Sequence, residues 1–213
     1  MNRFDLVIFD CDGVLVDSER LVVHVEAEIL AGLGWPLTEA DIIDRFVGRS
    51  ATYMQQEIEH HLGRSIDWES EFERRYREVL ESELVSVEGV ADALDIITVP
   101  CCVASSGSHE KMAFTLGMTG LIERFTGRIF SADEVEHGKP APDLFLCAAA
   151  RMGAKPHRCA VIEDSMSGVA AGVAAGMDVF AFAGGVTSAS KLTQDGVVVF
   201  DAMRDLPGLL GYP

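Results

Sequence analysis

Short apolar runs rich in β-branched residues recur along the chain and predict the strands of a parallel sheet. Five of these runs read LVIFD (6–10), VPCCVAS (99–105), GRIFSA (127–132), CAVIED (159–164) and DVFAFA (178–183), and a sixth, GVVVF (196–200), adds a strand near the C-terminus. Helical patterns separate the later runs, at HEKMAFTLGM (109–118), PDLFLCAAARMG (142–153) and SMSGVAAGVAAGM (165–177). Strands that are apolar throughout and alternate with helices are typical of a parallel sheet covered on both faces. The sequence therefore predicts an α/β fold with a Rossmann-like parallel sheet core.

The segment between the first two predicted strands has a different pattern. Residues 16–87 are mainly helical in periodicity, contain both tryptophans of the chain, and are densely charged around DWESEFERRYREVLESE (67–83). The segment has no apolar run of the kind that predicts the core strands. We therefore expect a helical domain at residues 16–87, inserted into a core made of residues 1–15 and 88–213.

Composition and charge narrow the classes of partner. With 48% hydrophobic and 24% charged residues, the 213-residue chain is typical of an ordered globular protein. Its 17 Lys and Arg residues against 34 Asp and Glu residues give a formal net charge of −17. Such a chain repels nucleic-acid phosphates and anionic membranes, so we expect no nucleic-acid and no membrane partner. A small anionic substrate stays compatible with this charge if a metal ion or a local lysine reverses the field in the site.

The cysteines, the N-terminal residues and the lengths of the apolar stretches indicate the cellular compartment. The five cysteines lack the paired spacing of metal sites, and their odd number argues against a disulfide framework. Several lie inside apolar runs, which favours buried, reduced side chains. The N-terminal residues show no secretory signal, and no apolar stretch approaches the roughly 20 residues of a membrane span. We therefore expect a cytoplasmic protein, with a monomer as the default state.

Polar residues follow four of the predicted strands, at the point where each strand ends. They are Asp10 and Asp12 after the first strand, Ser105 and Ser106 after the second, Lys139 beyond the third, and Glu163 and Asp164 after the fourth. Ligands of open α/β sheets bind beyond the carboxyl ends of the strands, so these residues are expected to converge in one cleft. Each has a structural alternative: Asp164 and Ser165, for example, can cap the helix that follows them. Their occurrence at four strand ends together favours a site for a magnesium ion and a phosphoryl group.

Four segments resemble, in order, the four motifs of the haloacid dehalogenase superfamily of phosphohydrolases. They are DCDGVLVDS (10–18), VASSGS (103–108), GKPAPDLF (138–145) and VIEDSMSGVAAGVAAGM (161–177). The position of the insert is similar to that of the helical C1 cap of this superfamily. The resemblance covers essentially the whole chain, more strongly in the core than in the cap. It implies a magnesium-dependent phosphatase that hydrolyses small phosphorylated metabolites, namely sugar or sugar-acid phosphates.

The resemblance also implies roles for the acidic residues. Asp10 is the nucleophile that forms an aspartyl-phosphate, and Asp12 is the general acid and base. A like-charge neighbour raises the pKa of one carboxyl group, which helps to keep an acid protonated near neutral pH. Mg²⁺ is bound by Asp10, by the backbone carbonyl of Asp12 and by Asp164, while Glu163 acts through metal-bound water.

The remaining motif residues are expected to bind the phosphoryl group. Ser105 and backbone N–H groups near Cys11, Asp12 and Ser106 bind its oxygens, and Lys139 neutralises its charge. Completion of the site by metal, lysine and phosphate then explains why acidic residues follow a buried strand.

Departures from related branches refine the expected activity. Dehalogenating members lack an acid at the position of Asp12, and the phosphonate-cleaving branch needs a cap lysine, whereas residues 1–90 contain no lysine. Hexose-phosphate mutases carry a histidine where this chain has Val22 and an arginine where it has Ala51.

A β-phosphoglucomutase-like phosphosugar mutase nevertheless stays the alternative function, and a non-catalytic phosphometabolite-binding protein is disfavoured by the intact motifs. The cap segments are more similar to the 6-phosphogluconate phosphatase group, with Arg49 as the candidate contact to a substrate anion or, alternatively, a solvated arginine.

Overall fold

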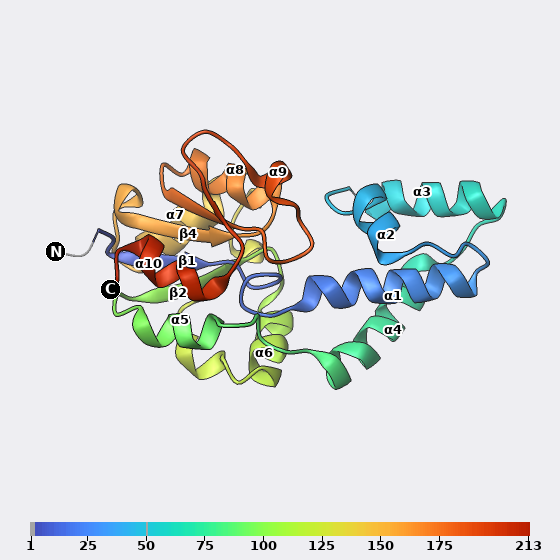
Figure 1. Ribbon diagram of the computed structural model, residues 1–213, viewed down its shortest axis with the longest axis horizontal. Coiled ribbons are helices and arrows are strands. Elements are labelled where there is room, and N and C mark those ends of the chain that lie inside the picture. The colour runs from blue at the N-terminus through green and yellow to red at the C-terminus, as the bar shows by residue number, and fades with distance from the viewer. Residues whose placement is uncertain (1–2, 50) are drawn as a thin grey trace. The chain divides into compact units, whose positions relative to one another are not determined.

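The computed structural model describes residues 3–49 and 51–213 (Figure 1), and the chain divides into two compact units. The larger unit consists of Met1–Asp17 and Val85–Pro213, and the smaller one consists of Ser18–Leu84.

A six-stranded parallel sheet forms the centre of the larger unit. Its strands are β1 (Leu6–Phe9), β2 (Cys101–Ser105), β3 (Ile129–Ser131), β4 (Cys159–Glu163), β5 (Asp178–Phe182) and β6 (Val198–Phe200). They lie in the order β3-β2-β1-β4-β5-β6, and every neighbouring pair is parallel. The predicted α/β fold with a parallel sheet is thus confirmed, and each of the six apolar runs contains a strand. The order places β1 between β2 and β4, so residues after β1 have neighbours from both halves of the sheet.

Helices cover both faces of this sheet. They are α5 (Val90–Ile96), α6 (His109–Met118), α7 (Asp143–Arg151), α8 (Met166–Ala174), α9 (Ala189–Leu192) and α10 (Leu206–Leu210), with 3₁₀ turns at Ile122–Phe125, Ala132–Glu134, Pro156–Arg158 and Met203–Asp205. In Figure 1, α5 and α6 lie on the opposite side of the sheet from α8. The predicted helices at 109–118, 142–153 and 165–177 correspond to α6, α7 and α8.

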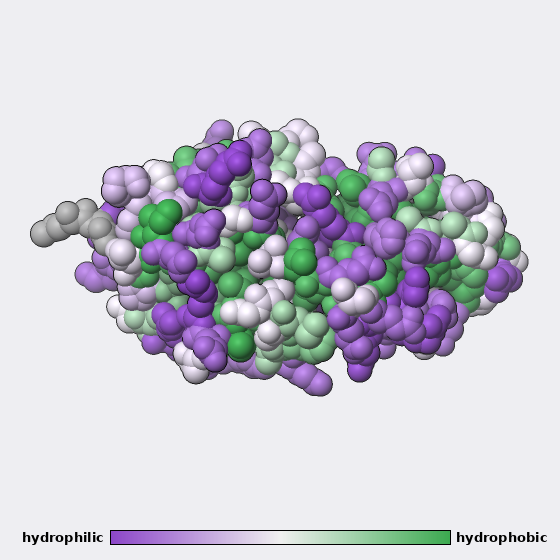
Figure 2. All heavy atoms as spheres, turned by 60° about the horizontal axis from the view of Figure 1, so that its bottom comes forward, coloured by the Kyte–Doolittle hydropathy of each residue, from purple (hydrophilic) through white to green (hydrophobic). Residues whose placement is uncertain are grey.

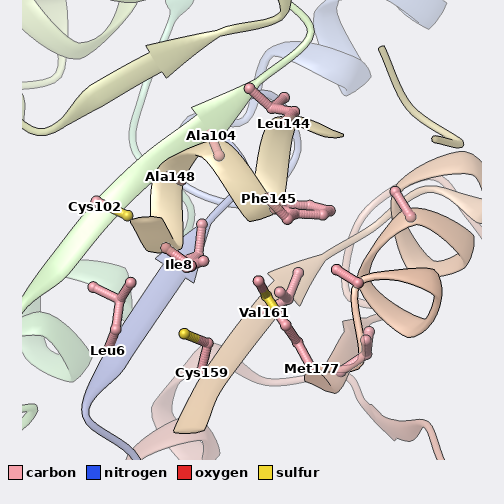
Figure 3. Packing of buried hydrophobic residues seen from close by; sticks show 14 of the residues in the cluster. Leu6, Ile8, Cys102, Ala104, Leu144, Phe145, Ala148, Cys159, Val161 and Met177 are labelled. Atoms are coloured by element: carbon pink, nitrogen blue, oxygen red, sulfur yellow. The ribbon is translucent and has the colours of Figure 1, made fainter. Parts of the chain in front are cut away.

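Alternation of side chains along the strands builds a separate core on each face. Ile8 and Val161 belong to one buried cluster with Phe145 and Ala148 of α7 (Figure 3). Phe9 belongs to the other face, where its ring packs edge-on against Phe125 at 6.4 Å between centroids. Because successive strand residues face opposite sides and both sides are buried, the strands are apolar throughout.

The cysteines are free, as predicted, and four of the five are buried. Cys102 and Cys159 lie in the cluster of Figure 3 as small apolar side chains. Burial raises the pKa of Cys159 to about 11 and that of Cys101 to about 12, so both stay protonated thiols at neutral pH. In the part of the chain that the structure describes, no helix has the length and apolar character needed to cross a membrane.

The smaller unit is built from helices. They are α1 (Ser18–Gly32), α2 (Glu39–Arg45), α3 (Ala51–Leu62) and α4 (Trp68–Glu83), and no strand occurs among its described residues. An ion pair of 2.9 Å between Arg75 of α4 and Glu28 joins α4 to α1. Hydrophilic residues predominate on much of the surface of this unit in Figure 2, in keeping with the charged pattern of α4.

The two chain segments that lead into and out of the helical unit pair with each other. The Asp17 N–H donates to the Val85 carbonyl and the Val87 N–H donates to the Leu15 carbonyl, both at 3.0 Å. Asp17 and Val85, which pair in this way, both belong to the larger unit. The compact helical unit accordingly runs from Ser18 to Leu84, within the insert expected at residues 16–87.

Candidate active site

A buried ion-pair network joins the ends of β1 and β4. The Lys139 ammonium donates to Oδ1 of Asp10 and, at 2.7 Å, to Oε1 of Glu163. The Lys139 side chain is 3% exposed and that of Glu163 is 1% exposed. Lys139 comes from the loop after β3, so three segments that are distant in sequence meet at this point. Two carboxylates facing one ammonium leave the network with an excess of negative charge.

The second oxygen of Glu163 is held by the start of α8. Its Oε2 accepts from the backbone N–H of Ser165 at 2.8 Å and from the Ser165 hydroxyl at 2.9 Å. The same hydroxyl accepts from the Gly168 N–H at 3.0 Å and is the N-cap of α8, so Ser165, not Asp164, caps this helix. Because both oxygens of Glu163 have protein donors, the geometry favours an indirect role for this residue beside a metal ion.

Gly168 provides the space that the Glu163 carboxylate occupies. A Cβ atom at position 168 would lie 1.7 Å from Oε1 of Glu163, far inside van der Waals contact. The glycine in the motif is therefore required by the close approach of α8 to a buried carboxylate.

Asp12 is paired with a lysine that the sequence analysis did not single out. The Lys111 ammonium donates to Oδ2 of Asp12 at 2.7 Å. Lys111 lies in the first turn of α6, whose N-cap is Ser108. The sequence did indicate that Lys111 lies near the site, since the predicted helix at 109–118 begins just beyond Ser105 and Ser106 and carries a lysine in its first turn.

A turn at Gly13 follows β1 and Asp12. Gly13 has φ 76°, in the left-handed region that suits glycine, and its N–H donates to the Val16 carbonyl at 2.8 Å.

Cys11 lies between the two acids and is 1% exposed, with its Sγ 3.9 Å from the Thr115 hydroxyl of α6. Burial raises the pKa of the Cys11 thiol. Only the backbone of Cys11 is therefore suited to bind an anion.

Ser105 lies at the carboxyl end of β2, and Ser106 is exposed in the loop that follows. Ser105 is 2% exposed, and its Oγ accepts from the Gly107 N–H at 3.1 Å. A Cβ atom on Gly107 would lie 3.6 Å from this Oγ and 3.8 Å from Oδ2 of Asp12. The Ser105 hydroxyl and the Asp12 carboxylate thus lie against the same glycine.

Asp164 follows β4 and is 5% exposed. A Cβ atom on Gly185, in the loop after β5, would lie 4.0 Å from Oδ2 of Asp164 and 3.9 Å from the Gly13 carbonyl oxygen. The carboxylate of Asp164 and the turn after Asp12 therefore both lie close to Gly185. All seven core residues expected from the strand ends are consequently at the carboxyl edge of the sheet.

The electrostatics of the site follow from burial. Burial raises the pKa of Asp10 to about 7, with the charges of Glu163 and Asp12 adding to the rise and Lys139 opposing it. Burial alone would lower the pKa of Lys139, but the two carboxylates outweigh it and raise this pKa. Lys139 therefore stays protonated at neutral pH.

The donor set fits a divalent cation. Four carboxylates (Asp10, Asp12, Glu163 and Asp164) outnumber the two ammonium groups (Lys111 and Lys139) that lie with them. Among the described residues, His, Cys, Asp and Glu side chains form no cluster of three or more that could hold a metal ion by themselves. Mg²⁺ commonly uses one or two carboxylates and keeps several waters, so a pair of carboxylates with a backbone carbonyl suits it.

Arg49 belongs to the helical unit, on the turn after α2. Its guanidinium carbon lies 5.6 Å from the centroid of the Tyr53 ring, and the residue is exposed. This placement fits both a ligand contact and a solvated arginine.

Replacing Gly168 with alanine should displace the Glu163 carboxylate and with it the ion pair to Lys139. We expect G168A to lower the free energy of unfolding by about 1–3 kcal/mol, as overpacking of a dense site does. Denaturant unfolding monitored by circular dichroism measures this change. The matched control is the same substitution in an E163A background, where the carboxylate is gone and G168A should cost little. An equal cost in both backgrounds would show that another contact requires Gly168.

Comparisons with known proteins agree with this geometry. A family model described as haloacid dehalogenase-like hydrolase matches residues 4–176. The chain is 30% identical over 213 residues to 6-phosphogluconate phosphatase of Escherichia coli, an alignment that covers 98% of this chain and 96% of that protein. A solved structure of a conserved haloacid dehalogenase-like protein of unknown function from Agrobacterium tumefaciens has a TM-score of 0.89 at 35% identity, with 97% of both chains covered. A haloacid dehalogenase family hydrolase from Deinococcus radiodurans was solved with bound phosphate and sodium. It has a TM-score of 0.82 at 29% identity, with 99% of this chain and 98% of that chain covered. The chain belongs to the haloacid dehalogenase-like hydrolase family.

Proposed function

We propose that this hydrolase cleaves small phosphate monoesters, sugar or sugar-acid phosphates, with Asp10 as its nucleophile. The observation that carries the proposal is the buried contact of Lys139 with Asp10, which fixes a carboxylate at the end of the central strand. The near full-length similarity to a 6-phosphogluconate phosphatase supports the substrate class. The phosphate in the Deinococcus relative supports a phosphoryl ligand.

The proposed reaction proceeds in two displacements. A carboxylate oxygen of Asp10 attacks phosphorus, and the ester oxygen leaves with a proton from Asp12. This gives an aspartyl-phosphate, which a water molecule then hydrolyses after Asp12 has removed a proton from it. Lys139 holds Asp10 through Oδ1 in both steps, in which Asp10 is first the nucleophile and then the leaving group.

The hydroxyl of Ser105 is proposed to donate a hydrogen bond to a phosphoryl oxygen. Its burial at the end of β2 beside Gly107 gives it a fixed position. Backbone N–H groups near Cys11, Asp12 and Ser106 add donors that cannot rotate away from the phosphoryl group. Donors that are in place before the reaction stabilise developing charge without reorganisation.

Asp10, Asp164 and the backbone carbonyl of Asp12 are proposed to hold Mg²⁺, with Glu163 acting through a water molecule. When bound, the cation offsets the repulsion between an anionic nucleophile and a dianionic phosphate. The excess of carboxylates over ammonium groups in the site supports this assignment. Glu163 contributes by holding Lys139 against Asp10.

Asp10→Asn should abolish turnover with little change in the fold. Asparagine keeps the shape of the side chain but is no nucleophile for phosphorus, so kcat should fall by at least about a thousandfold. Phosphate release from p-nitrophenyl phosphate and from a panel of phosphorylated sugars and sugar acids measures the loss. D195N, at an exposed loop position, is the matched control and should keep full activity. Turnover by D10N near that of D195N would refute the nucleophile. Isomerisation of a sugar phosphate by the unaltered protein without phosphate release would indicate a mutase instead.

Removal of divalent metal with EDTA should stop turnover, and Mg²⁺ should restore it. In Asp164→Ala, the Mg²⁺ concentration for half-maximal activity should rise about ten- to a hundredfold because one ligand is lost. A Mg²⁺ titration of the initial rate, with D195A as the control, measures this shift. An unchanged titration curve for D164A would place the metal elsewhere.

Arg49 is proposed to recognise a second anionic group of the substrate. Its planar guanidinium suits a carboxylate, as in a phosphorylated sugar acid. The exposure of the residue in the helical unit, with Tyr53 beside the guanidinium, supports its availability to a ligand.

Arg49→Ala should therefore act on one class of substrate. We expect kcat/KM for the best acidic substrate to fall roughly ten- to a hundredfold, which corresponds to about 1.4–2.7 kcal/mol. Hydrolysis of p-nitrophenyl phosphate, whose leaving group has no such anion, should change much less. Equal losses on both substrates would mean that Arg49 supports the fold or the chemical step.

A further inference from the structure

We propose that Lys111 is a positioning residue for Asp12 and holds its carboxylate in the orientation for proton transfer to the leaving group. This inference rests on the proposed function, in which Asp12 is the general acid. The Lys111 ammonium donates to Oδ2 of Asp12 at 2.7 Å, with the two side chains 41% and 15% exposed.

The first two turns of α6 contact consecutive residues of the loop after β1. Lys111 contacts Asp12, and Thr115, one turn later, lies with its hydroxyl 3.9 Å from the Cys11 sulfur. The start of the helix is fixed by Ser108, whose Oγ accepts from the Lys111 N–H at 3.2 Å. Thr115 is fully buried, and its hydroxyl donates to the Lys111 carbonyl at 3.1 Å. The backbone from which Lys111 extends is therefore anchored to the same loop as Asp12.

The stem of Lys111 reaches Asp12 past a residue without a side chain. A Cβ atom on Gly107 would lie 3.5 Å from Cδ of Lys111, 3.6 Å from Oγ of Ser105 and 3.8 Å from Oδ2 of Asp12. The lysine stem, the proposed phosphate-binding hydroxyl and the proposed acid thus surround one point. This arrangement places the Asp12 carboxylate beside the group that would bind the phosphoryl oxygens.

Lys111 is the lysine paired with Asp12. The chain contains four lysines, and Lys139 is engaged with Asp10 and Glu163. An ion pair as exposed as that of Lys111 is screened by water and contributes little to stability. Loss of Lys111 should therefore appear in the rate and not in the unfolding transition.

The step that Lys111 would assist is the first displacement. A bond forms between an oxygen of Asp10 and phosphorus, the ester P–O bond breaks, and the proton of Asp12 moves to the leaving oxygen. Lys111 keeps its own protons throughout. Proton transfer depends on the donor lying within hydrogen-bond reach of the leaving oxygen, so a carboxylate that is free to turn away is a poorer acid.

The experiment compares aryl phosphates of similar shape whose leaving groups differ in basicity. The value of kcat/KM, which reports on the first displacement, is measured for K111M, K111R and the unaltered protein with p-nitrophenyl phosphate and with phenyl phosphate. K111M should lose about 30-fold on phenyl phosphate, whose leaving oxygen needs a proton, but no more than about threefold on p-nitrophenyl phosphate. K111R keeps a donor and should stay within about threefold of the unaltered protein on both. K155M removes an exposed lysine at the opposite edge of the sheet and should change neither rate.

Two controls separate positioning from other roles. The inhibition constant of inorganic phosphate should be the same in K111M and the unaltered protein, and so should the melting temperature. Equal losses on both substrates with weaker phosphate inhibition would make Lys111 a phosphate ligand and overturn the inference. Equal losses with a lower melting temperature would make it a structural residue and overturn it as well. If the unaltered protein released no phosphate from either ester, the proposed function would itself be wrong and the inference would fall with it.

Discussion

The burial of Asp10 and Glu163 against Lys139 is the interaction on which the rest of the site depends. Removing one partner from a buried ion pair leaves an uncompensated charge, which costs about 3–5 kcal/mol. The three residues come from β1, β4 and the loop after β3, so this penalty couples the ends of two strands to a loop. The start of α8 takes part too, because Ser165 binds Glu163 and Gly168 leaves room for it. A charge requirement thus fixes the local backbone of three segments.

The sheet order explains why such a network can form. β1 pairs with β2 on one side and with β4 on the other, and the direction of strand addition reverses there. Helices on opposite faces leave a gap at such a reversal, at the carboxyl ends of the strands. Asp10 follows β1 and is linked through Lys139 to Glu163 of β4, while Ser105 ends β2 on the other side of β1. The residues of the proposed chemistry are thus brought to one edge of the sheet by hydrophobic packing.

The local hydrophobic pattern of the sequence predicted the helices and strands, but it could not predict contacts between distant segments. The strands could be predicted because burial on both faces makes each of them apolar throughout. The helix at 109–118 agrees with α6 at both ends, since Ser108 is a strong N-cap and Gly120 follows. Strand order, in contrast, depends on pairing between segments many residues apart. The partner of Lys111 was hidden for the same reason, because a lysine in the first turn of a helix is usually solvated. Likewise, the pairing of Asp17 with Val85 does not appear in the hydrophobic pattern of either segment.

The two lysines of the site differ in a way that bears on how an acidic protein accommodates an anionic substrate. A net charge of −17 repels a dianionic ester at long range, although salt limits this repulsion to about 8 Å at physiological ionic strength. Attraction must therefore come from groups that the substrate meets at short range. Lys139 is buried and paired with two carboxylates, so its charge is largely offset by Asp10 and Glu163. Lys111 is more exposed and reaches the same edge of the sheet from α6. With both lysines paired to carboxylates, neither leaves a net positive charge. In the proposed reaction, short-range attraction would come from a bound cation, from the backbone N–H donors of the site and, for an acidic substrate, from Arg49. On the proposed function, a metal ion would supply the positive charge that the substrate meets, and the two lysines would hold the carboxylates of the site in place.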